Sequence, residues 1–122
     1  TAKLTALHSD IYSALVRGKG TDAAQAYAAA NVEAVMSLRA TIERLDIDCA
    51  LTSATAYTCA ATADGVERIE QEANAAQAAG LPAELVDAGL EVPALAAVAL
   101  ADQAHLDLGS VGNAPCYRRT AG

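Results

Sequence analysis

Near residue 46 the sequence switches from a long helical repeat to a strand-like run, and this switch limits the folds open to the chain. In residues 21–45 apolar side chains recur every three or four positions, as on one face of a helix that Thr21 and Asp22 would begin. This face consists of Ala24, Ala28, Val32, Val35, Leu38, Ile42 and Leu45. Residues 49–61 are rich in Thr and contain no Lys, Glu or Asp, which predicts one or two strands. A short chain with both patterns is expected to pack helices against a sheet.

Shorter patterns predict the remaining elements. They are a helix over 3–17 ended by Gly18 and Gly20, a helix over 64–79 with an Asp64–Glu67 capping box and a stop at Gly80, and extended segments over 84–87 and 94–101. The alanines of residues 94–101 would also tolerate a helix. We therefore expect one α+β domain over residues 1–108, with an antiparallel helix pair and a third helix on a small, mainly antiparallel sheet. Residues 109–122 are expected to form an irregular tail.

The core should be thin, because the apolar residues are small. The chain has 122 residues, of which 53% are hydrophobic, but it has no Phe and no Trp. A chain of this length can bury a core without disulfides or metals. Leu, Val and Ile set among alanines are expected to fill it.

Charge and patterning exclude several classes of partner. The net charge is −7 and the basic residues are scattered, so nucleic-acid binding is not expected. The sequence shows neither a membrane-spanning run nor a leader pattern, which favours a cytoplasmic protein. A short sheet would leave an edge exposed, and either this edge or an alanine-rich helix face would favour a homodimer.

The cysteines do not predict a metal centre or a disulfide framework. They lie at positions 49, 59 and 116 without a Cys-x-x-Cys motif, and the two histidines are far apart in sequence. Neither Cys49 nor Cys59 lies beside a cation or at a clear helix start, so both are interpreted as small buried hydrophobic residues.

Four residues are candidates for a site, each with a structural alternative. His8 could act as a base, or be a partly buried helix histidine. His105 lies in a polar cluster typical of a binding edge or of a solvated loop. Arg39 could clamp a carboxylate ligand, or extend along the surface and pair with Glu43 one turn on. Tyr57 could bond a substrate from a strand, or be the main packing residue of its face. The structural reading is favoured in each case.

The common cofactor and catalytic motifs are absent from the sequence. There is no Gly-x-Gly-x-x-Gly after a strand, which a dinucleotide-binding fold requires. There is also no phosphate loop, no Gly-x-Ser-x-Gly elbow and no His-Glu-x-x-His. The residues by themselves identify no catalytic group.

Three stretches, in order, resemble an internal segment of FAD-dependent oxidoreductases of the D-amino-acid oxidase and glycine oxidase superfamily, in the branch that often carries a Rieske domain. They are Thr1–His8 with Ile11, Tyr12, Ala24, Tyr27, Ala30 and Asn31; Ala56–Thr58 with Ala63–Glu67, Ile69, Glu72 and Gly80–Glu84; and Ala101–Leu106. The resemblance covers about residues 1–108, and no single motif in it is highly specific.

The resemblance implies a partial or relic substrate-binding domain that is inactive as an isolated chain. It implies FAD as the family's cofactor, with Thr1 and Lys3 nearest to it, and a substrate cavity faced by Tyr57 and His105. Because the nucleotide-binding fingerprint is missing, this chain is not expected to hold FAD alone. The alternative is a small, self-associating assembly protein without catalytic activity.

Overall fold

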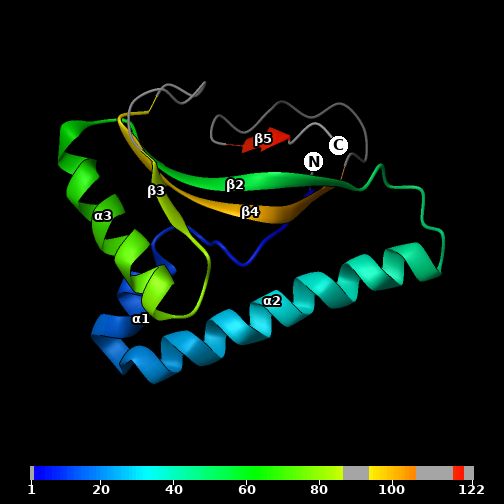
Figure 1. The fold of residues 1–122 in the computed structure, drawn as a ribbon, viewed down its shortest axis with the longest axis horizontal. Coiled ribbons are helices and arrows are strands. Elements are labelled where there is room, and N and C mark those ends of the chain that lie inside the picture. Colours follow the sequence, from blue (N-terminus) through cyan, green and yellow to red (C-terminus); the bar gives the residue numbers. More distant parts are fainter. Residues whose placement is uncertain (1, 87–93, 107–116, 120–122) are drawn as a thin grey trace.

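The computed structural model describes residues 2–86, 94–106 and 117–119 of the chain. Three helices and five strands lie within these residues (Figure 1). Their bounds are β1 Ala2–Leu4, α1 Ile11–Lys19, α2 Thr21–Arg44, β2 Thr52–Ala60, α3 Ala63–Ala78, β3 Glu84–Val86, β4 Ala96–Leu106 and β5 Tyr117–Arg119. The predicted α+β class, with three helices and a small antiparallel sheet, is confirmed.

The sheet is built around the long strand β4. Its order is β1-β4-β2-β5, with β3 also paired to β4, and every pairing is antiparallel. Because β2 occupies one side of β4, both β1 and β3 lie on the other side. There β3 pairs with residues 97–99 and β1 with residues 104–106. Residues 100–103 are thus left between the two short strands, on an edge that faces no strand among the described residues.

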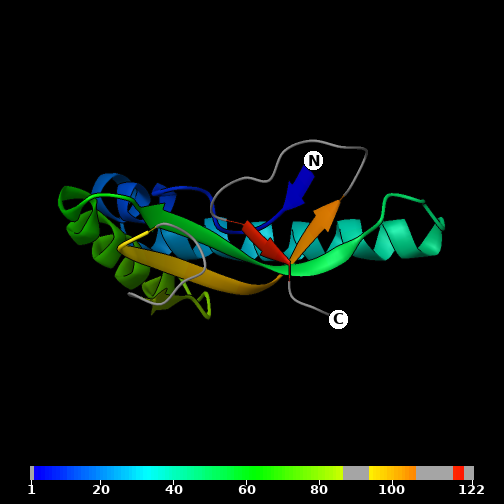
Figure 2. The ribbon, with the colours of Figure 1, turned by 90° about the horizontal axis from the view of Figure 1, so that it is seen from above.

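The helices gather on one end of the sheet, from which α2 extends along its length. Figures 1 and 2 both show α1 and α3 together at one end and α2 running to the other. The helix α3 packs on β2, β3 and β4, whereas α1 packs on α2 and α3. Most of the contact between α2 and the sheet is therefore with β4 alone.

The first predicted helix is wrong over its first half. Residues 2–4 form β1, in register with β4, and α1 begins only at Ile11. The pairing with β4 satisfies backbone groups that a helix over 3–17 would have bonded within itself. The intervening turn contains Ser9 with a φ of 53°, a conformation that no regular helix allows.

Both α2 and α3 end in a Schellman motif. At the end of α2, Asp46 takes up the left-handed φ of 51°, and Ile47 N–H donates to the Ile42 carbonyl at 3.0 Å. At the end of α3, Gly80 has a φ of 95° and Leu81 N–H donates to Ala76 at 3.1 Å. The predicted stop at Gly80 is confirmed, as is the change of character at residue 46.

The predicted capping box at the start of α3 is wrong. Thr62 is the N-cap residue and makes no side-chain capping bond, so Asp64 lies inside the first turn. A Cβ added to Gly65 would stand 3.2 Å from the Cβ of Ala60, which shows how closely the helix follows the end of β2. The chain therefore enters α3 directly from the strand.

The remaining predictions differ mainly in their bounds. The extended segment over 84–87 is confirmed as β3 at 84–86, and residue 87 lies outside the described residues. The segment over 94–101 is the first part of β4, which continues through His105. Within the predicted irregular tail, residues 117–119 form β5 against β2, and the domain boundary at residue 108 stays a prediction.

The core is thin and rich in alanine, as expected, but it also contains the buried aromatic residue Tyr12 and the buried acid Glu72. The largest fully buried side chains are Tyr12, Leu100, Glu72 and Val98. Tyr12 supplies the aromatic volume that the missing Phe and Trp would have given. No helix in the described part of the chain combines the length and the apolar character needed to cross a bilayer.

Candidate functional site

A β-bulge interrupts the pairing of β4 with β2 at the residues of β4 whose other edge is unpaired. Ala54 pairs with Gln103 and Ala56 with Leu100, so two residues of β4 stand opposite one residue of β2. One of these two, Asp102, has a φ of 58°, which aspartate tolerates better than most residues. The bulge leaves the Asp102 carbonyl available to a group outside the sheet.

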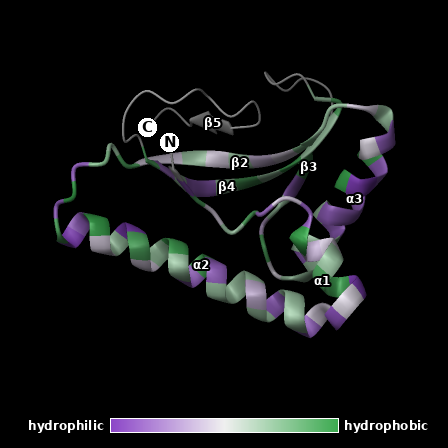
Figure 3. Ribbon diagram, turned by 180° about the vertical axis from the view of Figure 1, so that it is seen from behind, coloured by the Kyte–Doolittle hydropathy of each residue, from purple (hydrophilic) through white to green (hydrophobic). Residues whose placement is uncertain are grey.

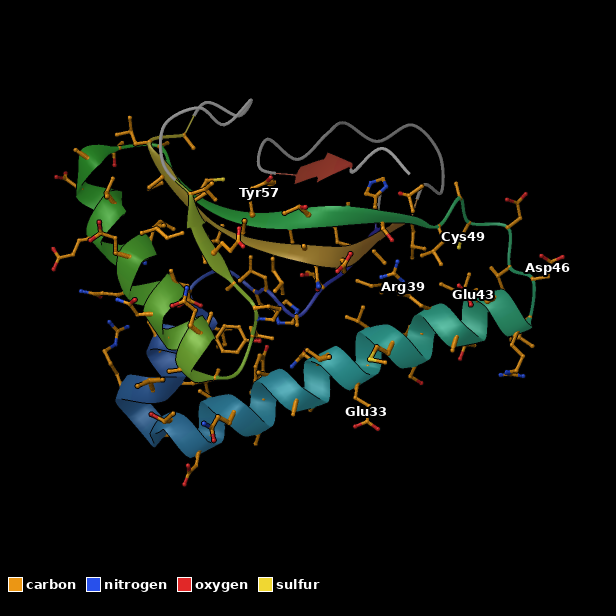
Figure 4. All side chains as sticks on the ribbon, viewed as in Figure 1. Glu33, Arg39, Glu43, Asp46, Cys49 and Tyr57 are labelled. Carbon is orange, nitrogen blue, oxygen red and sulfur yellow. The ribbon has the colours of Figure 1, made fainter. Side chains whose placement is uncertain are left out.

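That group is Arg39. Its guanidinium donates to the Asp102 carbonyl oxygen at 2.8 Å and also to the Ser53 hydroxyl, and so ties α2 to both β4 and β2. Figure 4 shows Arg39 rising from α2 toward the strands, while Glu33 points away from them. The expected pair with Glu43 does not form, because the one ion pair between described residues joins Arg68 to Asp10. Arg39 therefore keeps a structural role, with neutral acceptors.

Gln103 closes the edge beside the bulge. Its side-chain oxygen accepts a 2.8 Å hydrogen bond from Ala6 N–H, and its amide nitrogen donates to the Ala101 carbonyl at 2.9 Å. Gln103 is buried, so these bonds supply partners that water cannot reach. The side chain thereby holds the segment after β1 against the gap between β1 and β3.

An apolar groove runs between α2 and this edge. Its wider part has a volume of about 730 Å³ and its narrower part about 230 Å³, and the two share Val32, Met36 and Leu81. The narrower part reaches Leu100 and the bulge residue Asp102, where Arg39 crosses from helix to strand. Cavities of this size and apolar lining are typical of small-molecule sites.

A second polar cluster lies around the start of α1 and is fully built into the core. The buried Glu72 carboxylate accepts hydrogen bonds from the backbone N–H groups of Tyr12 and Ser13, at 3.0 and 2.8 Å. Glu72 on α3 thus caps the start of α1, where its negative charge is stabilised by the positive end of the α1 helix dipole. The Tyr12 hydroxyl donates to the Ala6 carbonyl. Burial first, and then Tyr27 and Glu72, raise the pKa of Tyr12 above its usual value.

His8 belongs to the same region but not to a helix. It lies in the turn before α1, half-buried, with Nδ1 2.8 Å from the Tyr27 hydroxyl and its ring edge-on to the Tyr27 ring. A tyrosine hydroxyl is a weak acid and base near neutral pH, and it holds the imidazole in place. The helical position predicted for His8 is therefore wrong.

The structure brings two of the predicted site residues together and separates the third. Lys3 on β1 lies opposite His105 on β4, and His105 lies opposite Thr52 on β2. His105 is 7% exposed, so it is a strand residue and not part of a solvated loop. Tyr57 pairs with Ala99 on the other half of β4, half-buried on the face away from the buried alanines of β2. Thr1 lies outside the described residues.

The cysteines differ from one another. Cys49 is a free, buried thiol in the loop after α2, as predicted, whereas Cys59 is disulfide-bonded. The interpretation of Cys59 as a small buried hydrophobic residue is wrong, because it is half-buried and bonded to another cysteine. Among the described residues, no three His, Cys, Asp or Glu side chains come together as a metal site would require.

Sequence reasoning found part of the groove and missed the rest. Val32 and Val35 were on the predicted apolar face of α2, but Met36 was not. The bulge at Asp102 has no signal in the sequence. Glu72 has one, because it falls three residues after Ile69 on the apolar side of α3.

Comparison with known proteins gives one informative match. No known protein family and no solved structure match this sequence. Over 86 residues the chain is 31% identical to YhfW of Bacillus subtilis (strain 168), a protein named as a candidate Rieske 2Fe-2S iron-sulfur protein. The match spans 70% of this chain but only 17% of the relative.

This finding corrects the prediction, based on the resemblance, that the chain is part of an FAD-dependent oxidoreductase. The relative is named for a Rieske 2Fe-2S centre and not for a flavin, so the expected FAD-dependent oxidoreductase and its FAD cofactor are wrong. The alternative, a small self-associating assembly protein, gains no support from the match. What the comparison establishes is a likeness to one segment of a much longer protein that is named as a candidate Rieske iron-sulfur protein.

Proposed function

We propose that this chain is a structural docking module of a longer iron-sulfur protein, and that the module does not itself hold the cluster. The observation that carries the proposal is an apolar stripe that the fold leaves uncovered on the second half of α2. Leu38 and Leu45 lie on this stripe at helical spacing, 47% and 55% exposed, and Ile47 follows at 47%. The same helix buries Ala24 and Ala28 in its first half and Val35 just beyond its middle.

The stripe is long enough to form a contact with another part of a protein. Figure 3 shows hydrophobic residues continuing along α2 to its C-terminal end. Covering the exposed halves of Leu38, Leu45 and Ile47 would contribute roughly 2–4 kcal/mol, since full burial of such a side chain contributes about 1.5–3 kcal/mol. Exposed apolar surface of this kind typically marks an interaction site.

The residues at hand do not fit a Rieske cluster. Such a centre needs two cysteine thiolates and two histidines. Cys59 is in a disulfide, and the described residues offer no gathered set of ligands. His8 instead lies beside the Tyr27 hydroxyl, and His105 is buried between β1 and β2. A cluster in the longer protein would accordingly be held by residues outside this module.

Hydrogen exchange tests the docking role. The 122-residue chain and the product of the complete reading frame that contains it would be compared by mass spectrometry. We expect residues 38–47 to exchange fast in the chain alone and to be protected in the longer product, with β2 and β4 protected in both. Equal exchange of residues 38–47 in the two proteins would refute the proposal.

The homodimer expected from the sequence is an alternative explanation of the exposed stripe, and light scattering tests it. Light scattering would be measured on the chain and on a Leu38→Asp, Leu45→Asp double variant. A dimer that the double variant converts to a monomer would assign the stripe to a second copy and overturn the docking role. A monomer in both cases is the result we expect.

Cluster binding and location are tested separately. Reconstitution of the chain with iron and sulfide should give no Rieske signal by electron paramagnetic resonance, and a stoichiometric signal would contradict the module's cluster-free role. A cytoplasmic location is part of the proposal, and the Cys59 disulfide of the structure stands against it, because disulfides persist in oxidising compartments and cytosolic thiols are kept reduced. Alkylation inside intact cells should label Cys59, and protection there would place the protein in an oxidising compartment.

A further inference from the structure

The residues of α2 follow a seven-residue repeat that continues past the covered half of the helix. The repeat alternates steps of four and three residues, and its members are Ala24, Ala28, Asn31, Val35, Leu38, Ile42 and Leu45. Only Asn31 is polar, and its amide donates to the Tyr27 carbonyl of the same helix at 2.8 Å. Apolar residues at this spacing are typical of a helix that packs along another helix.

Helices of this fold already cover one half of the repeat. Ala24 and Ala28 are buried in one core cluster with residues of α1 and α3. The second half of α2 extends beyond both of these helices (Figures 1 and 2), and there Leu38 and Leu45 are about half exposed. Because the repeat continues unchanged where its helical cover ends, the uncovered half is suited to a further helix.

A strand and an anionic membrane surface fit this half of α2 less well. An added strand is held by backbone bonds to a sheet edge, whereas the backbone groups of a helix are bonded within it. A helix that lies on a membrane surface has a basic polar face. Residues 38–48 contain two arginines, of which Arg39 is turned toward the sheet (Figure 4). The same residues contain three acids, which are Glu43, Asp46 and Asp48. These charges favour a basic partner.

We propose that the uncovered stripe packs against a single amphipathic helix of the longer protein, with apolar residues at the same seven-residue spacing and basic residues beside them. This inference rests on the docking role and names the partner. The matched segment is only 17% of the relative, so a protein of that kind has ample chain to supply such a helix. Helices that pack through this repeat lie nearly parallel or antiparallel, at about 20° to one another.

Site-specific cross-linking in the product of the complete reading frame tests the partner. A photoreactive diazirine analogue of leucine would replace Leu38 in one sample and Leu45 in another, and peptide mapping would locate the residues joined to each. These positions are two turns apart, about 10 Å along α2. We expect both to join one segment outside residues 1–122, at sites about seven residues apart, because a partner helix has the same rise per residue. Along a strand the same distance covers about three residues.

The cross-links distinguish the kind of partner from the docking role itself. Sites about three residues apart, sites in two separate segments, or a segment with more acids than bases would overturn the basic helix and leave the docking role standing. The control position is the exposed Ala40, which lies about 200° around the helix from Leu38. Cross-links to a second copy of the protein, or no more cross-linking from Leu38 and Leu45 than from Ala40, would overturn both proposals.

A pair of substitutions in the same product tests whether the contact follows the repeat. Ile42→Glu places a carboxylate between Leu38 and Leu45, and should remove the hydrogen-exchange protection of residues 38–47. Ala40→Glu adds the same charge on the opposite side of α2 and should keep that protection. Both variants should keep β2 and β4 protected, which shows that the module still folds. Equal effects of the two substitutions on residues 38–47 would show that the partner does not pack along the repeat.

Discussion

The Arg39 guanidinium on α2 donates a 2.8 Å hydrogen bond to the carbonyl oxygen of Asp102, in the bulge of β4. A second bond from Arg39 reaches the Ser53 hydroxyl on β2. Together these bonds fix the second half of a helix that otherwise has little contact with the sheet. One side chain thus joins α2 to both β4 and β2, beside the Asp102 end of the groove.

Replacing Arg39 by Met should loosen the second half of α2. The change keeps the aliphatic stem and removes both hydrogen bonds, at a cost of about 1–2 kcal/mol, since the site is partly exposed. Urea unfolding gives the stability, and amide exchange should accelerate in residues 38–44 more than in residues 21–30.

The matched control is Arg44→Met, at an exposed arginine of the same helix. It should change stability by less than about 0.5 kcal/mol, as is usual for surface positions. Equal effects of the two substitutions would show that Arg39 does not hold the helix to the sheet.

The bulge gives a prediction at Asp102, whose φ of 58° disfavours β-branched residues. Asp102→Val should destabilise the chain by about 1–3 kcal/mol, because valine cannot take up this conformation without strain. Asp102→Gly removes the same carboxylate but tolerates the positive φ, so it should be nearly neutral. Thermal unfolding of both variants makes the comparison, and equal losses would place the effect in the carboxylate and not in the backbone.

Glu72 gives a third prediction, because it caps α1 from inside the core. Glu72→Gln should cost roughly 2 kcal/mol, since a neutral amide offers only one acceptor to the N–H groups of Tyr12 and Ser13. Glu70→Gln, on the exposed side of the same helix, is the control and should be close to neutral. If both variants unfold at the same urea concentration, the buried carboxylate is not needed as a cap.

The sequence predicted elements where local patterns decide them and failed where distant segments do. The period of α2 and the stop at Gly80 are local, and both were found. Residues 2–4 have helical spacing, but pairing with residues 104–106 makes them a strand, and nothing near residue 3 signals that partner. The same holds for Arg39, whose acceptor lies 63 residues away, and for the bulge that presents it. The walls of the groove were thus partly predictable, and the contacts beside its narrow part were not.

The disulfide at Cys59 predicts a difference in reactivity between two cysteines. Maleimide should label neither Cys59 nor Cys49 quickly in the folded, oxidised protein, since one is bonded and the other is buried. Unfolding without reductant should expose Cys49 alone, and adding reductant should then expose Cys59. Peptide mapping after each step separates the two. Labelling of Cys59 in the unfolded, unreduced chain would show that its thiol is free.

The buried Tyr12 hydroxyl makes stability depend on pH in the alkaline range. Its pKa is raised in the folded protein from the usual 10.0, chiefly by burial, so the folded state holds the proton more tightly than the unfolded state. The contribution is therefore fully present below about pH 10 and is lost as pH rises above the unfolded value. Urea unfolding at pH 9 and pH 11 should show a steeper loss for the wild type than for Tyr12→Phe, which has no proton to release. Tyr57→Phe, on the half-buried outer face of β2, should keep the wild-type slope. A Tyr12→Phe variant that loses stability as steeply as the wild type would show that another group controls the alkaline transition.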